Sequence, residues 1–162
     1  FAVNKNEIME KVSKIAAYIV NEYKEKFGSP IDEMKLHKLL YFGQRESYVL
    51  HDEPLFEGSF HAGQYGPVVL EIREMYRNGK LTEMPSDEFV KEKRDIFEKL
   101  WSDYASKSAW SLSDLSHGEI SWKNAFERME NPQGPYNRID DRDIRKDALK
   151  IKRRRENIKE RI

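Results

Sequence analysis

Apolar residues recur at steps of three and four over most of the chain, and this helical periodicity is the feature that most restricts the fold. The first such stripe comprises Ile8, Val12, Ile15, Ile19 and Tyr23. Asn6 can cap the start of this helix, and Gly28 followed by Pro30 is a stop signal. Only one segment alternates as a strand does. We therefore predict a mainly α, single helical domain with at most a short β-hairpin or extended segment between Phe56 and Gln64.

A second helix is predicted to begin at Asp32. One of its faces carries Leu36, Leu39, Leu40, Gly43, Ser47 and Leu50. Aromatic side chains widen the apolar surface beyond a single stripe, which indicates a central position in the fold; they are Tyr41, Phe42 and Tyr48. Three basic residues, Lys35, Lys38 and Arg45, are expected to point outward.

The segment Tyr65-Gly66-Pro67 separates an extended stretch from a helical one. Gly66 permits a positive φ, and Pro67 has a fixed φ that suits the first position of a helix. We therefore predict that this turn starts a helix that runs from Pro67 to about Arg77.

Further helices are predicted in the second half of the chain. One begins near Ser86 and continues along an apolar side to Tyr104, and Ser113 and Ser121 mark the starts of two shorter ones. Residues 130–140, with two prolines and a glycine, are predicted to form a loop. Trp110 is expected in the core, or as an anchor for a partner where it is exposed.

Composition excludes several classes of protein. Basic and acidic residues balance at 29 each, which argues against a globally steered nucleic-acid binder. The absence of cysteine excludes disulfides, thiolate metal sites and cysteine nucleophiles. The longest apolar runs, such as residues 15–20, are far shorter than a membrane span. We expect a cytoplasmic protein with no membrane contact.

No catalytic, metal or cofactor site is predicted. The cluster His51-Asp52-Glu53 lacks a second ligand group at a familiar spacing and is interpreted as a surface turn. The glycines near Pro67 do not match a phosphate-binding loop, and the serines near His117 lack the context of a nucleophile. The residues therefore favour a protein that is not an enzyme.

The chain ends in a helical segment, residues 141–162, that is charged over most of its surface. With Arg155 filling one gap, a narrow apolar seam comprises Ile144, Ala148, Ile151, Ile158 and Ile162. From Leu149 onward, seven basic residues stand against two acidic ones, a net charge of +5. We divide the chain into a helical domain, residues 1–138, and a charged amphipathic helix, residues 139–162.

Three motifs, taken together, resemble a known signature. They are KLHKLLYFGQ at residues 35–44, PLFEGSFHAGQYGPVV at 54–69 and LSDLSHGEISWKNA at 112–125. Their order and spacing are similar to those of the Panacea domain, an antitoxin domain similar to the SocA proteolytic adaptor and to phage-associated proteins. The resemblance covers about residues 7–138. Gly63 stands where the family usually has an aromatic residue, and Ser116 stands where a threonine is common.

The resemblance implies a mostly helical antitoxin, encoded beside a toxin, that neutralises this toxin by direct binding. It implies no catalytic residue. It also implies that the Tyr65-Gly66-Pro67 turn is structural. The motif side chains expected around the turn are Tyr41, Gln44, His117 and Trp122.

Two alternatives remain open from the sequence. The protein could be an adaptor that delivers a bound toxin to a protease, or a DNA-binding autoregulator. The second is disfavoured, because no helix-turn-helix is apparent and the only basic patch is the C-terminal segment.

The terminal helix is the predicted partner-binding element. An isolated helix with so few apolar residues is marginal in water, so it needs a surface: its own domain, a second copy of the chain, or the toxin. Crowded arginines favour an acidic partner. The candidate contact residues are Ile151, Arg153, Arg154, Arg155 and Ile158.

Overall fold

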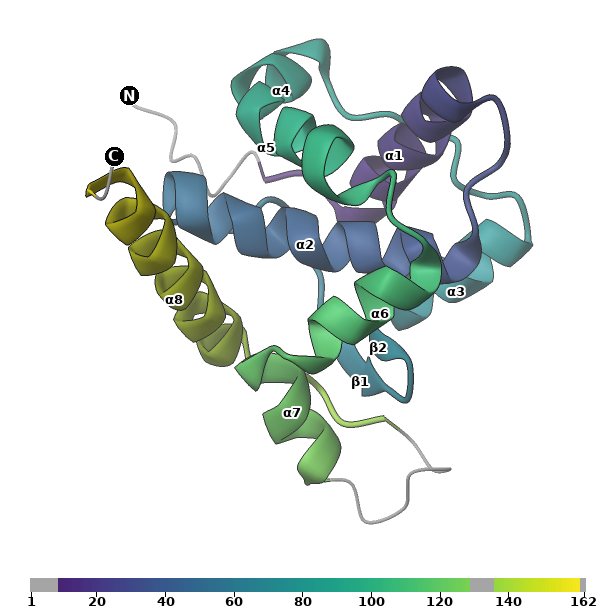
Figure 1. The fold of residues 1–162 in the computed structure, drawn as a ribbon. Coiled ribbons are helices and arrows are strands. Elements are labelled where there is room, and N and C mark those ends of the chain that lie inside the picture. The colour runs from purple at the N-terminus through teal and green to yellow at the C-terminus, as the bar shows by residue number, and fades with distance from the viewer. Residues whose placement is uncertain (1–8, 129–135, 161–162) are drawn as a thin grey trace, which may run out of the picture.

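The computed structural model describes residues 9–128 and 136–160, and it confirms a mainly α domain. The elements are α1 (Val12–Phe27), α2 (Glu33–His51), β1 (His61–Gly63), β2 (Gly66–Val68), α3 (Leu70–Arg77), α4 (Asp87–Glu92), α5 (Arg94–Lys99), the π-helical turn η2 (Leu100–Tyr104), α6 (Ala109–His117), α7 (Ile120–Glu127) and α8 (Asp141–Glu160). Figure 1 shows α2 in the middle of the molecule, with the other elements arranged around it.

Helix α2 is the centre of the fold, as predicted. It begins at Asp32, whose carboxylate accepts a hydrogen bond from Lys35 N at 3.1 Å. Every residue from Leu36 to Val49 is buried, because α2 packs against α1, α3, α5, α6 and α8. The prediction that Lys38 and Arg45 point outward is therefore wrong. A helix that is covered on all sides has no solvent face for its charges.

Helix α1 ends as predicted and begins later than predicted. Gly28 adopts φ 75° and donates its N–H to Lys24 O at 2.8 Å. The predicted cap, Asn6, lies outside the described residues. The described chain before Val12 is not helical, because Glu57 N donates to Glu10 O at 3.0 Å and Val12 N donates to Glu57 O at 3.2 Å.

The predicted hairpin exists, but it lies at residues 61–68. Strands β1 and β2 are antiparallel, with Ala62 opposite Pro67 and Gly63 opposite Gly66. Gly66 has the positive φ expected of it, 114°. Pro67 does not start a helix, so that prediction is wrong: it lies in β2, and α3 begins only after the extended Val69.

The position of Pro67 follows from the neighbours of β1. On its other side, β1 meets the chain that leads into α8: Ala62 N donates to Asn137 O, and Ile139 N donates to Phe60 O, both at 2.8 Å. Strand β2 is thus the outer strand of this small sheet, where a proline is tolerated. Of the predicted loop at residues 130–140, only residues 136–140 are described.

The region between residues 86 and 127 is more broken than predicted. Ser86 caps α4 as expected, but the single predicted helix is interrupted at Lys93 and ends in the π-helical turn. Ser108, and not Ser113, caps α6, and α7 starts after Glu119. The capping roles predicted for Ser113 and Ser121 are therefore wrong, since both are buried and bonded elsewhere.

Helix α8 packs against α2 and α7, as seen at the left of Figure 1. Ile144 and Ala148 of the predicted seam are buried, and Ile151 is half-buried. Ile158 is 53% exposed, and Ile162 lies outside the described residues. In the part of the chain that is described, no helix has both the length and the apolar character to cross a membrane.

Candidate partner-binding site

Side chains of α6 and α7 hold the turn of the hairpin by its backbone carbonyls. The three bonds run from Trp122 Nε1 to Gly63 O at 2.8 Å, from His117 Nε2 to Gln64 O at 3.1 Å, and from Ser113 Oγ to Tyr65 O at 2.7 Å. The rings of His117 and Trp122 stack at 4.1 Å, so each also orients the other. His117 and Trp122 thus lie at the turn.

Helix α2 holds the hairpin from the other side. The ammonium of Lys38 donates to Pro67 O at 3.1 Å, and His37 Nδ1 accepts a hydrogen bond from Val69 N at 3.1 Å. Burial lowers the pKa of Lys38 to about 8, and burial, assisted by nearby cations, lowers the pKa of His37 to about 3. His37 is therefore neutral at physiological pH, which leaves Nδ1 free to accept.

Gly66 is required by both backbone and packing. Its φ of 114° disfavours any side chain, and a Cβ atom at this position would lie 2.5 Å from Lys38 Cε and 2.5 Å from Ser116 Oγ. Side chains of the first and third motifs thus close on the backbone of the second, which gives the spacing of the three motifs a structural reason.

Tyr41 and Gln44 do not surround the turn, and that expectation is wrong. Tyr41 OH forms a hydrogen bond with Ser121 Oγ at 2.7 Å. The Gln44 amide accepts from Leu55 N at 2.8 Å and donates to Phe56 O at 3.2 Å. Tyr41 thus connects α2 to the start of α7, and Gln44 connects α2 to the extended segment around Phe56.

The tip of the hairpin carries exposed aromatic surface. Tyr65 is 47% exposed and Trp110, on α6, is 62% exposed. Their ring centroids lie 5.5 Å apart with the ring planes at 90°, an edge-to-face arrangement. Trp110 is thus at the surface and not in the core.

A buried network of charges lies at the other end of α2. Arg45 donates to Glu119 and to the hydroxyl of Tyr104, and it lies 3.4 Å from Glu46. Glu46 is also bonded by Arg155 of α8, at 2.5 and 2.8 Å. The network therefore connects α2, η2, α7 and α8, four segments that are distant in sequence.

The pKa values in this network follow from burial and pairing. Burial would raise the pKa of Glu46, but hydrogen bonds and charge from Arg155, together with Arg45, hold it below its usual value. Burial raises the pKa of Glu119, and the nearby carboxylate of Asp147 adds to the effect against the opposing charge of Arg45.

The predicted contact residues of α8 divide into two groups. Arg155 is bound to Glu46 of its own domain, and Ile151 packs against the core. Arg153, Arg154 and Ile158 are exposed. Of the three adjacent arginines, Arg155 is thus paired with Glu46 of its own chain, and Arg153 and Arg154 remain exposed.

Sequence reasoning missed the buried network. Glu46 and Glu119 were not singled out, and Arg45 was expected to be solvated. A signal was available: Arg45 and Glu46 directly follow the apolar motif of residues 35–44, and Glu119 lies inside the motif of residues 112–125. Charges at such positions are buried only when they are paired.

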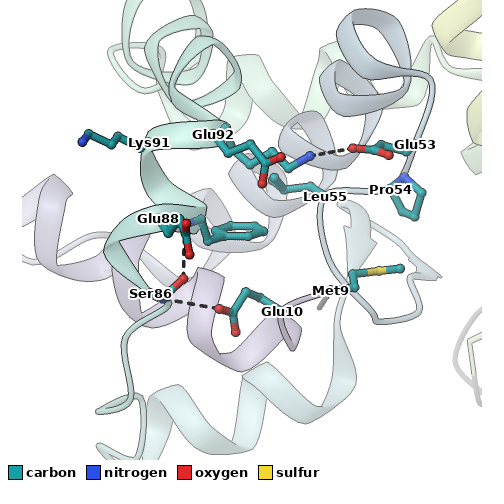
Figure 2. Close-up of a pocket in the computed structure, with 11 residues that line it drawn as sticks. Met9, Glu10, Glu53, Pro54, Leu55, Ser86, Glu88, Lys91 and Glu92 are labelled. Atoms are coloured by element: carbon teal, nitrogen blue, oxygen red, sulfur yellow. Dashed lines mark hydrogen bonds and ion pairs between the residues drawn. The ribbon is translucent and has the colours of Figure 1, made fainter. Parts of the chain in front are cut away.

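A separate pocket of about 840 Å³ lies between α4 and the segment around Pro54 (Figure 2). Lys93 pairs there with Glu53 at 2.7 Å, and Ser86 N donates to Glu10 at 3.3 Å. These polar groups are thus engaged with one another.

The residues His51, Asp52 and Glu53 have different partners and roles and do not form one group of ligands. His51 Nε2 lies 2.9 Å from Asp95, Glu53 pairs with Lys93, and Asp52 ends α2 with φ 54°. Within residues 9–128 and 136–160, no group of three or more His, Cys, Asp or Glu side chains could hold a metal ion.

The comparisons identify the family. The model of the family described as antitoxin SocA-like, Panacea domain, matches residues 36–123, which extend from α2 to α7. The match covers more than half of the chain. The chain therefore belongs to this Panacea-domain family. Its structure is a helical domain in which several motif side chains bond to the backbone of the hairpin. No curated protein and no solved structure matches it.

Proposed function

We propose that this protein is a cytoplasmic antitoxin that neutralises a cognate protein toxin by binding it directly. The observation that carries the proposal is the match of residues 36–123 to an antitoxin family. The geometry agrees with the match, because side chains of the first and third motifs bond to the backbone of the second.

Binding, and not catalysis, is the proposed mode of action. Backbone groups of the hairpin, or of Val69 directly after it, bond to five polar motif side chains: His37, Lys38, Ser113, His117 and Trp122. Groups used in this way hold a surface in shape. The protein therefore offers a partner a surface of fixed shape, and such surfaces bind with a smaller entropic cost.

Co-expression tests this proposal. The product of the neighbouring reading frame is induced alone and together with this protein, and growth is measured. We expect growth arrest by the first and relief by the second. An arrest that this protein does not relieve would contradict the proposal.

A protease-deficient host separates neutralisation from delivery to a protease. Direct neutralisation predicts the same relief in this host as in the parent strain. Relief that depends on the protease would indicate the adaptor alternative. A reporter fused to the promoter of the operon tests the DNA-binding alternative, for which we expect no repression by this protein alone.

A further inference from the structure

A cleft beside α8 has the charge pattern of a binding site. It has a volume of about 760 Å³ and lies between η2, the junction of α6 and α7, and α8. We call it the α8 cleft. The lining residues that matter here are Arg45, Lys107, Leu115, Lys150, Ile151 and Arg154.

The acidic groups of the α8 cleft already have partners. Glu119 is bonded by Arg45, and Asp103 pairs with Lys99 at 2.6 Å. Asp147 accepts hydrogen bonds at 2.8 and 2.9 Å from the backbone N–H groups that begin α7. The three carboxylates of the cleft are therefore already engaged by other groups of the protein.

The basic groups at its rim have no such partners. Lys107, Lys150 and Arg154 are exposed, and in the described ranges none of the three has an ion pair. In the floor, Arg45 is 5% exposed, and its Nε–H has no acceptor among the described residues. A buried hydrogen-bond donor without an acceptor is uncommon. The rim of the site thus presents three cations that no acidic residue of the described ranges neutralises, and the floor adds one free N–H donor, while the charge of Arg45 itself is paired with Glu119.

Apolar surface accompanies this charge. Leu115 is 46% exposed, and Ile151 is half-buried at the same cleft. Concave sites that combine apolar walls with a few charged groups suit a peptide segment that carries both kinds of side chain. A nucleic acid is disfavoured, because the chain as a whole has no net charge, and apolar contacts to Leu115 and Ile151 suit a peptide better than a phosphate backbone.

The cleft is also held in shape without a ligand. Arg155, one position after Arg154, is tied to Glu46 in the core. This ion pair fixes the outer half of α8 beside η2, so Lys150 and Arg154 need little reordering when a partner arrives.

We propose that the α8 cleft is the docking site for an acidic segment of the toxin, whose carboxylates contact Lys107, Lys150 and Arg154 and whose apolar side chains contact Leu115 and Ile151. This inference rests on the proposed antitoxin function. It assigns to the partner a stated chemistry, an acidic and partly apolar surface segment.

Charge reversal with a matched control tests the inference. The test variant is Lys150→Glu with Arg154→Glu. The control is Lys152→Glu with Lys159→Glu, which makes the same change of charge on exposed positions of the same helix that do not line the cleft. Affinity is measured for the toxin from the neighbouring frame and for a labelled poly-L-glutamate peptide, with a DNA duplex as the competing probe.

We expect the test variant to lose at least tenfold in affinity for both the toxin and the peptide, and the control to lose less than threefold. Equal losses in the two variants, or tighter binding of the wild-type protein to DNA than to the peptide, would overturn the inference. Toxin neutralised equally by all three proteins would overturn this site but leave the antitoxin function standing. Absence of neutralisation by the wild type would instead contradict the function, while the peptide still reports on the cleft.

Discussion

The two halves of α8 have the same helical backbone and very different surroundings. In the inner half, residues 141–148, Ile144, Asp147 and Ala148 are buried against α2 and α7. In the outer half, residues 149–160, Leu149 and Ile158 are exposed, and the connections to the core are the half-buried Ile151 and the ion pair of Arg155 with Glu46.

The difference shows how one amphipathic helix can serve two purposes. The inner half is part of the fold. The carboxylate of Asp147 accepts hydrogen bonds from the first N–H groups of α7, and the apolar side chains are buried in the core. The outer half extends a basic surface from that anchor. We therefore expect changes in the inner half to lower stability and changes in the outer half to lower affinity.

The largest expected effect is that of Asp147→Ala in the inner half. The substitution leaves the N–H groups of Ile120 and Ser121 without their acceptor in a buried place, so we expect a loss of about 3 kcal/mol in the free energy of unfolding. Leu149→Ala, on the exposed side, is the control and should change it by less than about 0.5 kcal/mol. Urea titration measures both, and similar losses would remove the distinction between the halves.

Gly66→Ala tests the hairpin, which, like the inner half of α8, we expect to contribute to stability and not to toxin binding. We expect a loss of about 2 kcal/mol, because the new Cβ atom meets Lys38 and Ser116 at a positive φ. Gly79→Ala is the control: φ there is also positive, but nothing lies within 4 Å, so the loss should be about half as large. Toxin affinity that falls while the melting temperature of Gly66→Ala is unchanged would show that the hairpin is a contact site.

Arg155→Met tests the connection between the two halves. Glu46 would keep Arg45 and Tyr104 but lose its closest partner, and because Arg155 is partly exposed we expect a loss of only about 1 kcal/mol at neutral pH. The outer half should then be less ordered, and its amide hydrogens should exchange faster than those of the inner half.

The same variant makes a prediction about pH. The pKa of Glu46 lies below its usual value in the folded protein, chiefly because the bonds from Arg155 outweigh its burial. Its contribution to stability is therefore present above the unfolded pKa of about 4.3 and is lost as the pH falls through the folded value. The difference in unfolding free energy between wild type and Arg155→Met should shrink below about pH 4, and a constant difference would contradict the assigned pairing.

The smallest expected effect on stability is that of Ile158→Ser. This residue is exposed, so we expect less than about 0.5 kcal/mol. Ile151 is unsuitable for the same test, because it packs against the core. Calorimetry of toxin binding shows whether Ile158 belongs to the contact surface: a reduced affinity at unchanged stability would extend that surface beyond the α8 cleft, and an unchanged affinity would confine it.

Local signals in the sequence were sufficient for much of the fold. The cap at Asp32, the stop at Gly28 and the positive φ of Gly66 each depend on a residue and its close neighbours. Helical periodicity likewise located α2 and α8. Prediction failed where distant partners decide the outcome: Ser113 bonds to Tyr65 and not to its own helix, and Pro67 joins a strand.

The candidate site was predictable only where local patterns in the sequence mark its residues. Ile151 and Arg154 were singled out from the seam and the basic run, and both line the α8 cleft. Arg155 belongs to the same run but turns to Glu46, a partner 109 positions earlier, which no local pattern could indicate. Lys107 comes from a different segment, so its place in the site depends on how η2 packs.

Direct neutralisation through α8 can be tested with purified components only. This protein is added in increasing amounts to the purified toxin from the neighbouring frame, and the toxin's own activity is measured without protease or nucleotide. We expect complete inhibition near equimolar amounts by the wild type and by the Lys152→Glu, Lys159→Glu control, with at least tenfold more required of the Lys150→Glu, Arg154→Glu variant. Inhibition that appears only when an ATP-dependent protease is added, or that is identical for all three proteins, would contradict direct neutralisation through α8.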